Sequence, residues 1–373
     1  MRDKPYCKAP WIGLNYESTI GCKPCCEYIG GTIGINPGSF KGTYADYIKS
    51  DWLKDFKKMM YKDTMNPGCK ICIDQENNTN RLSRRQKYQK YEINEHGNNK
   101  VIRFDYRPGN KCNLICRMCH PESSSMREEE EIQRGNIQSI FRIEDMNDAY
   151  DIDLTECETL SILGGEPSID LEVRKWIDHI KDLDIRVDIT TNATNVSDKW
   201  FNTLKKLKKL EIRLSIDGTG NANDFQRKGS NWKEIKSNIL KYKKEFQNIS
   251  ISLTASAINF TVLDIWWEEL MEFNIPINMG LVEFPEEYNL GAIPDKYKEY
   301  QIEWLQKWIE NPDTFGYNRR QQHEALEAIK ILQENTYRED YHQIFKREVK
   351  KMDKWRNENI SDLDYRFEEI LNA

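Results

Sequence analysis

The sequence predicts an α/β protein: a partial (β/α)6 barrel, with a small cysteine-rich α+β module before it and a helical extension after it. Three observations predict this arrangement. Strand-like and helix-like segments alternate from about residue 101 to about residue 290, as in folds built on a parallel sheet. Nine of the ten cysteines come before residue 120. From about residue 291 the chain is heavily charged, and its apolar residues recur at helical spacing.

Composition and charge narrow the class of protein. At 373 residues the chain is long enough for one large domain and a smaller one. A net charge of −6 gives no general affinity for nucleic acid. No apolar run approaches the ~20 residues that a membrane span needs, and residues 1–5 lack the apolar core of a signal peptide. We therefore expect a cytoplasmic protein, whose cysteines are metal ligands or reactive thiols rather than disulfides.

Residues 1–80 are predicted to form the small module. A strand is expected at 9–16, a helix over about 44–61 and a turn at 66–68. A core this short and polar needs an additional stabilising link between its segments, and a bound metal supplies one. Six cysteines are available for it: Cys7, Cys22, Cys25, Cys26, Cys69 and Cys72.

Residues 81–100 are predicted to be a basic and then polar connector between the module and the barrel. A basic run suggests nucleic-acid binding. Apart from Tyr88 and Tyr91, however, it lacks the interleaved aromatic residues on which bases stack. A solvated helix face is therefore the preferred interpretation.

Residues 101–290 are predicted to hold the barrel and residues 291–373 the helical extension, which would cover the open barrel or form a dimer contact. Helices are expected at 123–134 and 171–183. In barrels of parallel strands the chemistry lies at the carboxyl ends of the strands, so polar residues there are the candidates for a site. The six expected strands are 101–106, 159–163, 186–190, 210–216, 249–255 and 277–283.

Three cysteines in C-x3-C-x2-C spacing follow the first strand: Cys112, Cys116 and Cys119. A structural zinc or an electron-transfer cluster takes four protein ligands. Three thiolates on a four-iron cubane leave one iron open, where S-adenosylmethionine can bind through its amino and carboxylate groups. An electron from the cluster can then cleave its C–S bond, chemistry that no side chain supplies. A zinc knuckle completed by His120 is the alternative.

This loop resembles the signature of radical S-adenosylmethionine (radical SAM) enzymes, with Met118 where the family usually has an aromatic residue. A Gly-Gly-Glu-Pro stretch after the second strand matches the family's segment for the methionine end of the cofactor. The resemblance implies a [4Fe-4S] cluster on the three cysteines. It also implies that S-adenosylmethionine binds to Gly164, Gly165, Glu166 and Pro167.

Further polar residues follow the third and fourth strands, at Thr191, Asn192, Ser215 and Asp217. With Arg227, the last two resemble the Ser-x-Asp-Gly…Arg-x-Gly run of SPASM-type enzymes. The resemblance implies that these five residues contact the ribose and carboxylate of the cofactor, with arginine as a bidentate partner. Turn formation and helix capping are the alternatives, and Asp217 could instead orient its loop.

The spacing of the module's cysteines resembles the SPASM and twitch pattern, in which modules of these enzymes hold auxiliary clusters. The pattern is C-x13-G-x4-C, from Cys7 through Gly21 to Cys26, followed by a distant C-x2-C pair. The three further cysteines of the full SPASM pattern are absent, so the arrangement is that of a twitch module. The resemblance implies a second, auxiliary [4Fe-4S] cluster on Cys7, Cys26, Cys69 and Cys72.

Two features of the module stay open. Either Cys22 or Cys25 could replace Cys26, and four thiolates also suit a structural zinc. In twitch-containing radical proteins of phage and environmental genomes the module precedes the barrel, as here, and a Glu…Ser-x-Arg segment follows the cysteine pair. The matching residues are Glu76, Ser83 and, with a departure of one in the spacing, Arg84 or Arg85.

The resemblance implies an enzyme that reductively cleaves S-adenosylmethionine to a 5′-deoxyadenosyl radical for hydrogen abstraction. Modification of a peptide or protein side chain is the leading hypothesis, with an electron donor such as flavodoxin or ferredoxin. A dehydrogenase of a small alcohol or sugar metabolite is the alternative, and a non-catalytic zinc-binding interaction protein is the second. We expect no membrane or nucleic-acid partner. No catalytic residue is identified, although Cys157 is either a buried hydrophobe or a hydrogen donor to a substrate radical.

Overall fold

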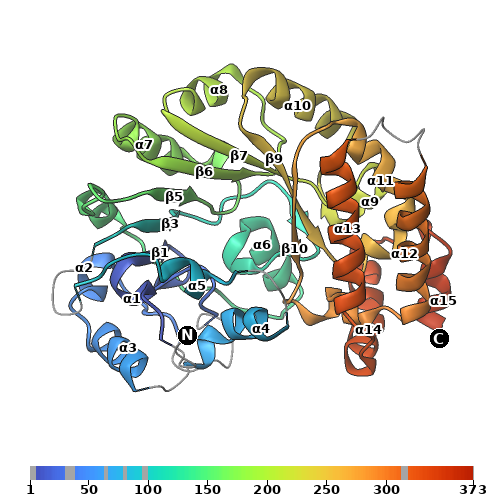
Figure 1. Cartoon of the computed structure of the whole chain (residues 1–373), viewed down its shortest axis with the longest axis horizontal. Helices are drawn as coiled ribbons and strands as arrows, with labels where there is room; N and C mark the ends of the chain where they lie inside the picture. Colours follow the sequence, from blue (N-terminus) through green and yellow to red (C-terminus); the bar gives the residue numbers. More distant parts are fainter. Residues whose placement is uncertain are drawn as a thin grey trace. The chain divides into compact units, whose positions relative to one another are not determined.

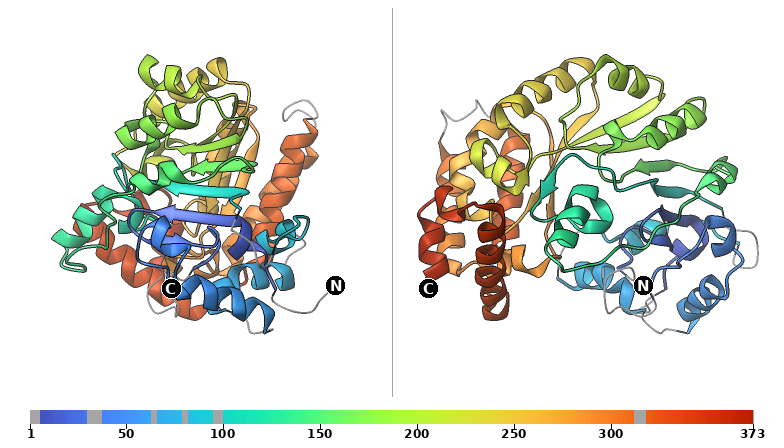
Figure 2. Two further views of the ribbon diagram at one scale, coloured as in Figure 1. Left: turned by 90° about the vertical axis from the view of Figure 1, so that its left-hand side faces the viewer. Right: turned by 180° about the vertical axis from the view of Figure 1, so that it is seen from behind.

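The computed structural model describes residues 6–29, 38–62, 66–78, 82–94, 100–311 and 318–372 (Figures 1 and 2). Its main sheet has eight strands, mostly parallel, in the order β10-β9-β7-β6-β5-β3-β1-β2. Within the described ranges β10 and β2 are the outermost strands, with an isolated bridge from Cys22 to Phe40 beyond β2, so the sheet is open, as predicted for a partial barrel. The chain divides into two compact units. The first is Met1–Asn113, His120–Thr190 and Asp198–Glu211, and the second is Leu114–Cys119, Thr191–Ser197 and Ile212–Ala373.

The six strands predicted for the barrel are confirmed, with ends that shift by up to two residues. They are β3 (Arg103–Arg107), β5 (Thr159–Ile162), β6 (Arg186–Thr191), β7 (Lys209–Ser215), β9 (Ile249–Ala255) and β10 (Ile277–Leu281). Two further strands of the sheet come from the cysteine-rich segment: β1 (Gly13–Glu17) and β2 (Gly21–Lys23). The predicted strand at 9–16 is wrong in its first half, because Ala9–Ile12 form the short helix α1 with Pro10 in its first turn, a position that suits proline.

In the first unit, β1 joins the cysteine-rich segment to the first strand of the predicted barrel. It pairs in parallel with β3, from Gly13 opposite Arg103 to Glu17 opposite Arg107, and antiparallel with β2. β3 then pairs with β5, and β5 with β6, all in parallel. The domain boundaries at residues 80, 100 and 290 stay predictions, but the described strands of this segment belong to the main sheet.

The helices of the first unit largely follow the sequence pattern. The predicted helix 44–61 is interrupted, because Ser50 caps a new helix by accepting a hydrogen bond from the Leu53 amide. Of the predicted connector, residues 81 and 95–99 lie outside the described ranges, and the rest contains one short helix. The helices are α1 (Ala9–Ile12), α2 (Tyr44–Tyr47), α3 (Asp51–Tyr61), α4 (Lys70–Asn78), α5 (Arg84–Tyr88), α6 (Ser125–Gln133), α7 (Leu171–Ile180) and α8 (Asp198–Leu204), with 3-10 turns η1 (Pro67–Cys69), η2 (Pro121–Ser123), η3 (Asn147–Asp151) and η4 (Pro167–Ile169).

Alternation along β3 gives the first unit an apolar face and a polar face. Phe104 and Tyr106 lie on the first face and pack against Trp176 of α7, with ring centroids 6.0 and 4.6 Å apart. Arg103, Asp105 and Arg107 alternate with them and lie on the other face. One part of the core of this unit therefore lies between β3 and α7, and a second hydrophobic cluster includes Trp11 of α1 and Phe56 of α3.

In the second unit, β7, β9 and β10 are parallel neighbours, and a separate two-stranded sheet pairs β4 (Ile115–Cys116) with β8 (Arg227–Lys228). The predicted helical extension is confirmed, and its helix α13 contacts the edge strand β10, where the Ile277 amide donates to Glu324 at 2.9 Å. The helices are α9 (Gly220–Gln226), α10 (Trp232–Glu245), α11 (Leu263–Glu272), α12 (Asp295–Glu310), α13 (Arg319–Glu334), α14 (Glu339–Arg356) and α15 (Arg366–Asn372), with 3-10 turns η5 (Phe260–Val262), η6 (Glu286–Tyr288), η7 (Leu290–Ala292) and η8 (Ile360–Asp362). Among the described helices of the chain, none is both long and apolar enough to span a bilayer.

We expect Trp176→Ala to lower the free energy of unfolding by about 3–5 kcal/mol, because it empties a site between α7 and β3 that has no solvent contact. Leu171→Ala on the same helix is the control. Leu171 is 58% exposed, so its loss should cost about 0.5 kcal/mol or less. Chemical denaturation of both variants measures this, and equal effects would contradict the packing described.

Candidate functional site

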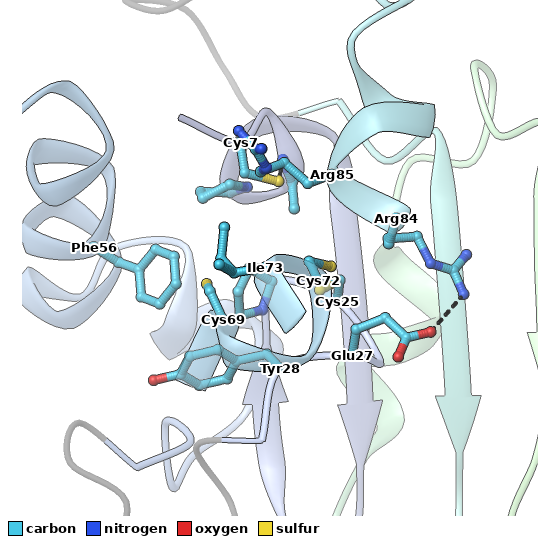
Figure 3. Close-up of a pocket in the computed structure, with 13 residues that line it drawn as sticks. Cys7, Cys25, Glu27, Tyr28, Phe56, Cys69, Cys72, Ile73, Arg84 and Arg85 are labelled. Atoms are coloured by element: carbon cyan, nitrogen blue, oxygen red, sulfur yellow. Dashed lines mark hydrogen bonds and ion pairs between the residues drawn. The ribbon is translucent and has the colours of Figure 1, made fainter. Parts of the chain in front are cut away.

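A pocket in the first unit is lined by four cysteines that are far apart in the sequence: Cys7, Cys25, Cys69 and Cys72. Figure 3 shows them around the pocket, with Tyr28 and Phe56 on one side. The empty space is about 440 Å³, part of it open to solvent. The structure thus brings together three of the four predicted auxiliary ligands.

Local structure explains how the cysteines reach the pocket. Cys7 precedes α1, Cys25 follows β2, and the other two lie on consecutive turns at η1 and the start of α4. Asn66 shapes η1 through two hydrogen bonds. Its side-chain Oδ1 accepts from the Gly68 amide at 2.9 Å, and its backbone carbonyl accepts from the Cys69 amide at 2.9 Å. A Cβ added at Gly68 would lie 2.1 Å from the Tyr28 ring, so glycine lets this turn pack against the pocket wall.

The fourth predicted ligand, Cys26, is not in the pocket, and Cys25 takes its place. The Cys26 thiol instead accepts a hydrogen bond from Arg84 Nη2 at 3.1 Å, and Arg84 pairs with Glu27 at 3.5 Å (Figure 3). Adjacent side chains point in different directions, so the spacing pattern cannot choose between neighbours. Cys22, the other surplus cysteine, is buried against the Gly42 carbonyl.

The pocket thiols are poorly solvated. Burial raises the pKa of Cys7 and of Cys69 to about 12, and raises that of Cys25 well above its ordinary value. Burial also raises the pKa of Cys72, although backbone amides of Arg85 and Arg84 oppose the rise. Neutral thiols therefore fill the site at neutral pH, and a metal that binds there has to displace their protons.

Backbone and side-chain groups around the pocket suit a thiolate-bound group. The Ala9 amide donates to Cys7 Sγ at 3.4 Å. Arg85 lies at the pocket and pairs with Glu76, which also accepts from the Ser83 hydroxyl. The Glu…Ser-x-Arg segment is thus one connected group, and its arginine is Arg85. Among the described residues, no three Cys, His, Asp or Glu side chains lie close enough to hold a single metal ion.

The Gly-Gly-Glu-Pro turn packs against the chain that leads into Cys112. The Glu166 amide donates to the Lys111 carbonyl at 2.7 Å, and the Cys112 amide donates to Ser125 Oγ at 3.1 Å. A Cβ at Gly165 would lie 2.2 Å from the Lys111 carbonyl oxygen, so this approach requires glycine. The Glu166 side chain is buried and accepts from the Ser168 amide at 3.0 Å. The first unit thus holds a buried carboxylate next to the start of the cysteine loop.

The other two cysteines of the loop belong to the second unit, where Arg227 lies beside one of them. Cys116 is opposite Arg227 in the β4–β8 pair, and Arg227 Nη1 is 4.0 Å from Cys116 Sγ. The Cys119 amide donates to the Cys116 carbonyl at 3.2 Å, so the loop turns tightly between them. Asp217 accepts from Arg227 Nε at 2.7 Å and from the Thr254 amide at 2.8 Å. Asp217 therefore fixes the guanidinium beside a predicted cluster ligand.

Two of the three remaining polar candidates form turns. Thr191 Oγ1 accepts from the Ala193 amide at 3.3 Å, and Asn192 Oδ1 accepts from the Thr194 amide at 3.0 Å. Ser215 is the last residue of β7 and is half-buried. Their role in cofactor binding stays a prediction.

Cys157 lies away from the other candidates of the first unit. It precedes the amino end of β5, whereas Gly164 follows the carboxyl end. Its thiol donates to the Thr159 carbonyl at 3.5 Å, and burial raises its pKa to about 12. This position favours the buried hydrophobe over the hydrogen donor. All ten cysteines lie in described ranges, and none forms a disulfide.

Comparison with known proteins identifies the central part of the chain. A model of the Radical SAM superfamily matches residues 106–273. An uncharacterized protein of Methanocaldococcus jannaschii is 34% identical over 108 residues, which are 28% of this chain and 31% of that protein. A probable GTP 3′,8-cyclase of Methanococcus maripaludis is 28% identical over 157 residues, which are 41% of this chain and 47% of the relative. The chain thus spans less than half the length of these relatives.

Solved structures with a similar fold are distant. For anSMEcpe with bound AdoMet the identity is 18% and the TM-score 0.44, over 56% of this chain and 58% of that one. For Streptococcus suis SuiB bound to S-adenosylmethionine the identity is 18% and the TM-score 0.38, over 56% and 44%. Neither likeness carries an argument about function, and the identification depends on the family match and the cysteine loop inside it. Residues 106–273 of this chain therefore match the Radical SAM superfamily, and this match indicates an enzyme.

Proposed function

We propose that the enzyme cleaves S-adenosylmethionine reductively, with a [4Fe-4S] cluster on Cys112, Cys116 and Cys119. The observation that carries this proposal is the C-x3-C-x2-C loop inside the matched domain. The donor set fits, because three thiolates leave one iron open to the cofactor. When bound, the cluster supplies the electron that splits S-adenosylmethionine, and the radical so formed abstracts a hydrogen atom from the substrate.

Within this proposal, Glu166 and Arg227 receive the charged groups of the cofactor's methionine end. The buried Glu166 carboxylate accepts hydrogen bonds well, which suits an ammonium group. Arg227 carries a permanent charge that Asp217 holds in place through Nε. Gly164, Gly165 and Pro167 shape the turn, and Thr191, Asn192 and Ser215 are the candidates for the ribose.

We propose further that the pocket of the first unit holds the auxiliary [4Fe-4S] cluster, on Cys7, Cys25, Cys69 and Cys72. Four cysteines from three separate segments line it, and amides donate toward two of the sulfur atoms. The apolar wall of Tyr28 and Phe56 limits access of water. A structural zinc with the same four ligands is the alternative, and metal analysis separates the two.

The substrate class rests on the twitch-like cysteine pattern alone. Such modules accompany radical SAM enzymes that modify peptides or proteins, so a peptide or protein side chain is the leading hypothesis for the substrate. A small alcohol or sugar metabolite is the second hypothesis. An external electron donor such as flavodoxin or ferredoxin and a cytoplasmic location belong to the same proposal. The cysteines without disulfides are consistent with a reducing compartment.

The first test concerns cleavage of the cofactor. Anaerobically reconstituted and reduced protein should convert S-adenosylmethionine to 5′-deoxyadenosine and methionine, measured by chromatography. Replacing Cys112, Cys116 and Cys119 with Ala together should abolish the product and remove about four irons, because the cluster loses every protein ligand. Product formation by the triple variant at the wild-type rate would refute the assignment.

The second test separates the two neighbouring cysteines of the module. Cys25→Ser should remove about four irons, as should a Cys69→Ala/Cys72→Ala variant, because each takes ligands from the pocket. Cys26→Ser should keep the wild-type iron content, since Arg84 rather than the pocket faces that thiol. Iron analysis with absorbance of the brown protein measures this. The reverse result would restore Cys26 as the ligand, and zinc in place of iron would establish the structural alternative.

The third test concerns Glu166. Glu166→Gln keeps the shape of the turn and its bond to the Ser168 amide but removes the charge, so it should weaken binding of S-adenosylmethionine by about 1.5–3 kcal/mol. Glu172→Gln, which neutralises an exposed carboxylate on α7, is the control and should bind normally. Iron content should be unchanged in both. If Glu166→Gln binds S-adenosylmethionine with wild-type affinity, the Gly-Gly-Glu-Pro segment is a structural turn and does not bind the cofactor through Glu166.

A further inference from the structure

Arg117 is an arginine between two cysteines of the loop, and its guanidinium is completely buried in the second unit. Nη2 donates to Asp353 Oδ1 at 2.6 Å and also pairs with Glu358. The guanidinium carbon lies 3.8 Å from the centre of the Phe225 ring, within the range of a cation–π contact. The Arg117 amide donates to the Gln226 carbonyl at 2.7 Å. Backbone and side chain thus both fix this residue.

The two carboxylates come from the C-terminal extension, more than 230 residues further along the chain. Asp353 lies in the last turn of α14, where Oδ2 accepts from the Ile360 amide at 2.8 Å. The Glu358 amide donates to the Asp353 carbonyl at 2.9 Å, and the turn between them passes through Asn357 in the left-handed region. Both carboxylates are therefore held by their own backbone before they meet Arg117.

One of these carboxylates, Glu358, also reaches the strand opposite the cysteine loop. Lys228 of β8 pairs with Glu358 at 2.8 Å and donates to the Arg356 carbonyl at 3.3 Å. β8 in turn pairs with β4, which carries Cys116. The end of α14 is thus joined to both strands of this small sheet, through Arg117 next to β4 and through Lys228 on β8.

The charges indicate what this arrangement contributes. Two cations meet two anions, so the largely buried cluster of Arg117, Lys228, Asp353 and Glu358 is neutral. A neutral buried ion network adds little net stability compared with apolar packing, because desolvation offsets the attraction. It does specify geometry, since a guanidinium has fixed donor directions. The network is therefore suited to fixing the shape of the loop.

We propose that Asp353 and Glu358 are positioning residues, which hold Cys116 and Cys119 through Arg117 in the conformation that binds the cluster. This inference rests on the proposed function for its cluster, but the loop can also be tested without iron. In metal sites, loss of groups that orient the ligands commonly costs 10–100-fold in affinity. We expect the same range here, because an unanchored loop must be ordered by the metal itself.

The variants are Asp353→Asn and Glu358→Gln in the full chain. Both keep shape and remove charge, and the amide oxygen that Asp353→Asn introduces can still accept from the Ile360 amide. The control is Asp264→Asn, which breaks another buried ion pair of the second unit, with Arg366 at 2.8 Å. The two aspartates are buried to a similar extent, because the side chain of Asp264 is 13% exposed and that of Asp353 is 11% exposed. Asp264 contacts Gln301, Tyr300 and Arg366. A general loss of stability should therefore appear in the control as well.

Two measurements test the proposal. In reconstituted protein, a chelator should remove the loop's iron about 10–100-fold faster from Asp353→Asn and Glu358→Gln than from wild type and from Asp264→Asn. In metal-free protein, mass spectrometry should show faster alkylation of Cys116 and Cys119 in the two variants, with Cys157 unchanged. Wild-type rates in both measurements, or equal rates in Asp264→Asn, would overturn the proposal. Failure of the proposed function would appear separately, because the variant without Cys112, Cys116 and Cys119 would then hold as much iron as wild type. In that case the alkylation rates would still show whether Asp353 and Glu358 position the loop.

Discussion

The parallel pairing of β1 with β3 is the contact on which the arrangement of the first unit depends. It aligns the amino ends of both strands, so α1 and Cys7 lie beside the start of β3. The antiparallel return of β2 brings Cys25 to the same end. Cys112 and the Gly-Gly-Glu-Pro turn instead follow the carboxyl ends of β3 and β5. Five residues of strand separate the two ends by roughly 17 Å, so the pocket and Cys112 lie at opposite ends of these strands.

The two cysteine groups also differ in the charge around them. In the pocket of the first unit, burial raises the pKa of the Cys7 and Cys69 thiols, and the guanidinium of Arg85 forms an ion pair with Glu76. A metal that binds there must supply the charge that stabilises four thiolates, so binding and folding of this segment are coupled. In the second unit a guanidinium held by Asp217 lies 4.0 Å from Cys116. A cation therefore lies beside this predicted ligand.

Local patterns predicted much of the fold and the core of the candidate site. The six barrel strands are short apolar or alternating runs, and the cysteine loop and the Gly-Gly-Glu-Pro turn are contiguous motifs. Other features depend on contacts that no local pattern encodes. Nothing in a five-residue strand indicates that Gly13 faces Arg103, and spacing cannot decide between the adjacent Cys25 and Cys26.

The anchoring of Arg117 illustrates why a site of this kind extends beyond its motif. An arginine with no side-chain exposure, placed between two predicted metal ligands, needs anions, and the motif itself contains none. The C-terminal extension supplies both of them, at positions set by the end of α14 and the turn after it. One of these carboxylates, Glu358, also binds Lys228, so a single residue contacts both the strand that carries Arg227 and the residue after the strand that carries Cys116. The helical extension is therefore joined to the cysteine loop by contacts between residues more than 200 positions apart in the sequence.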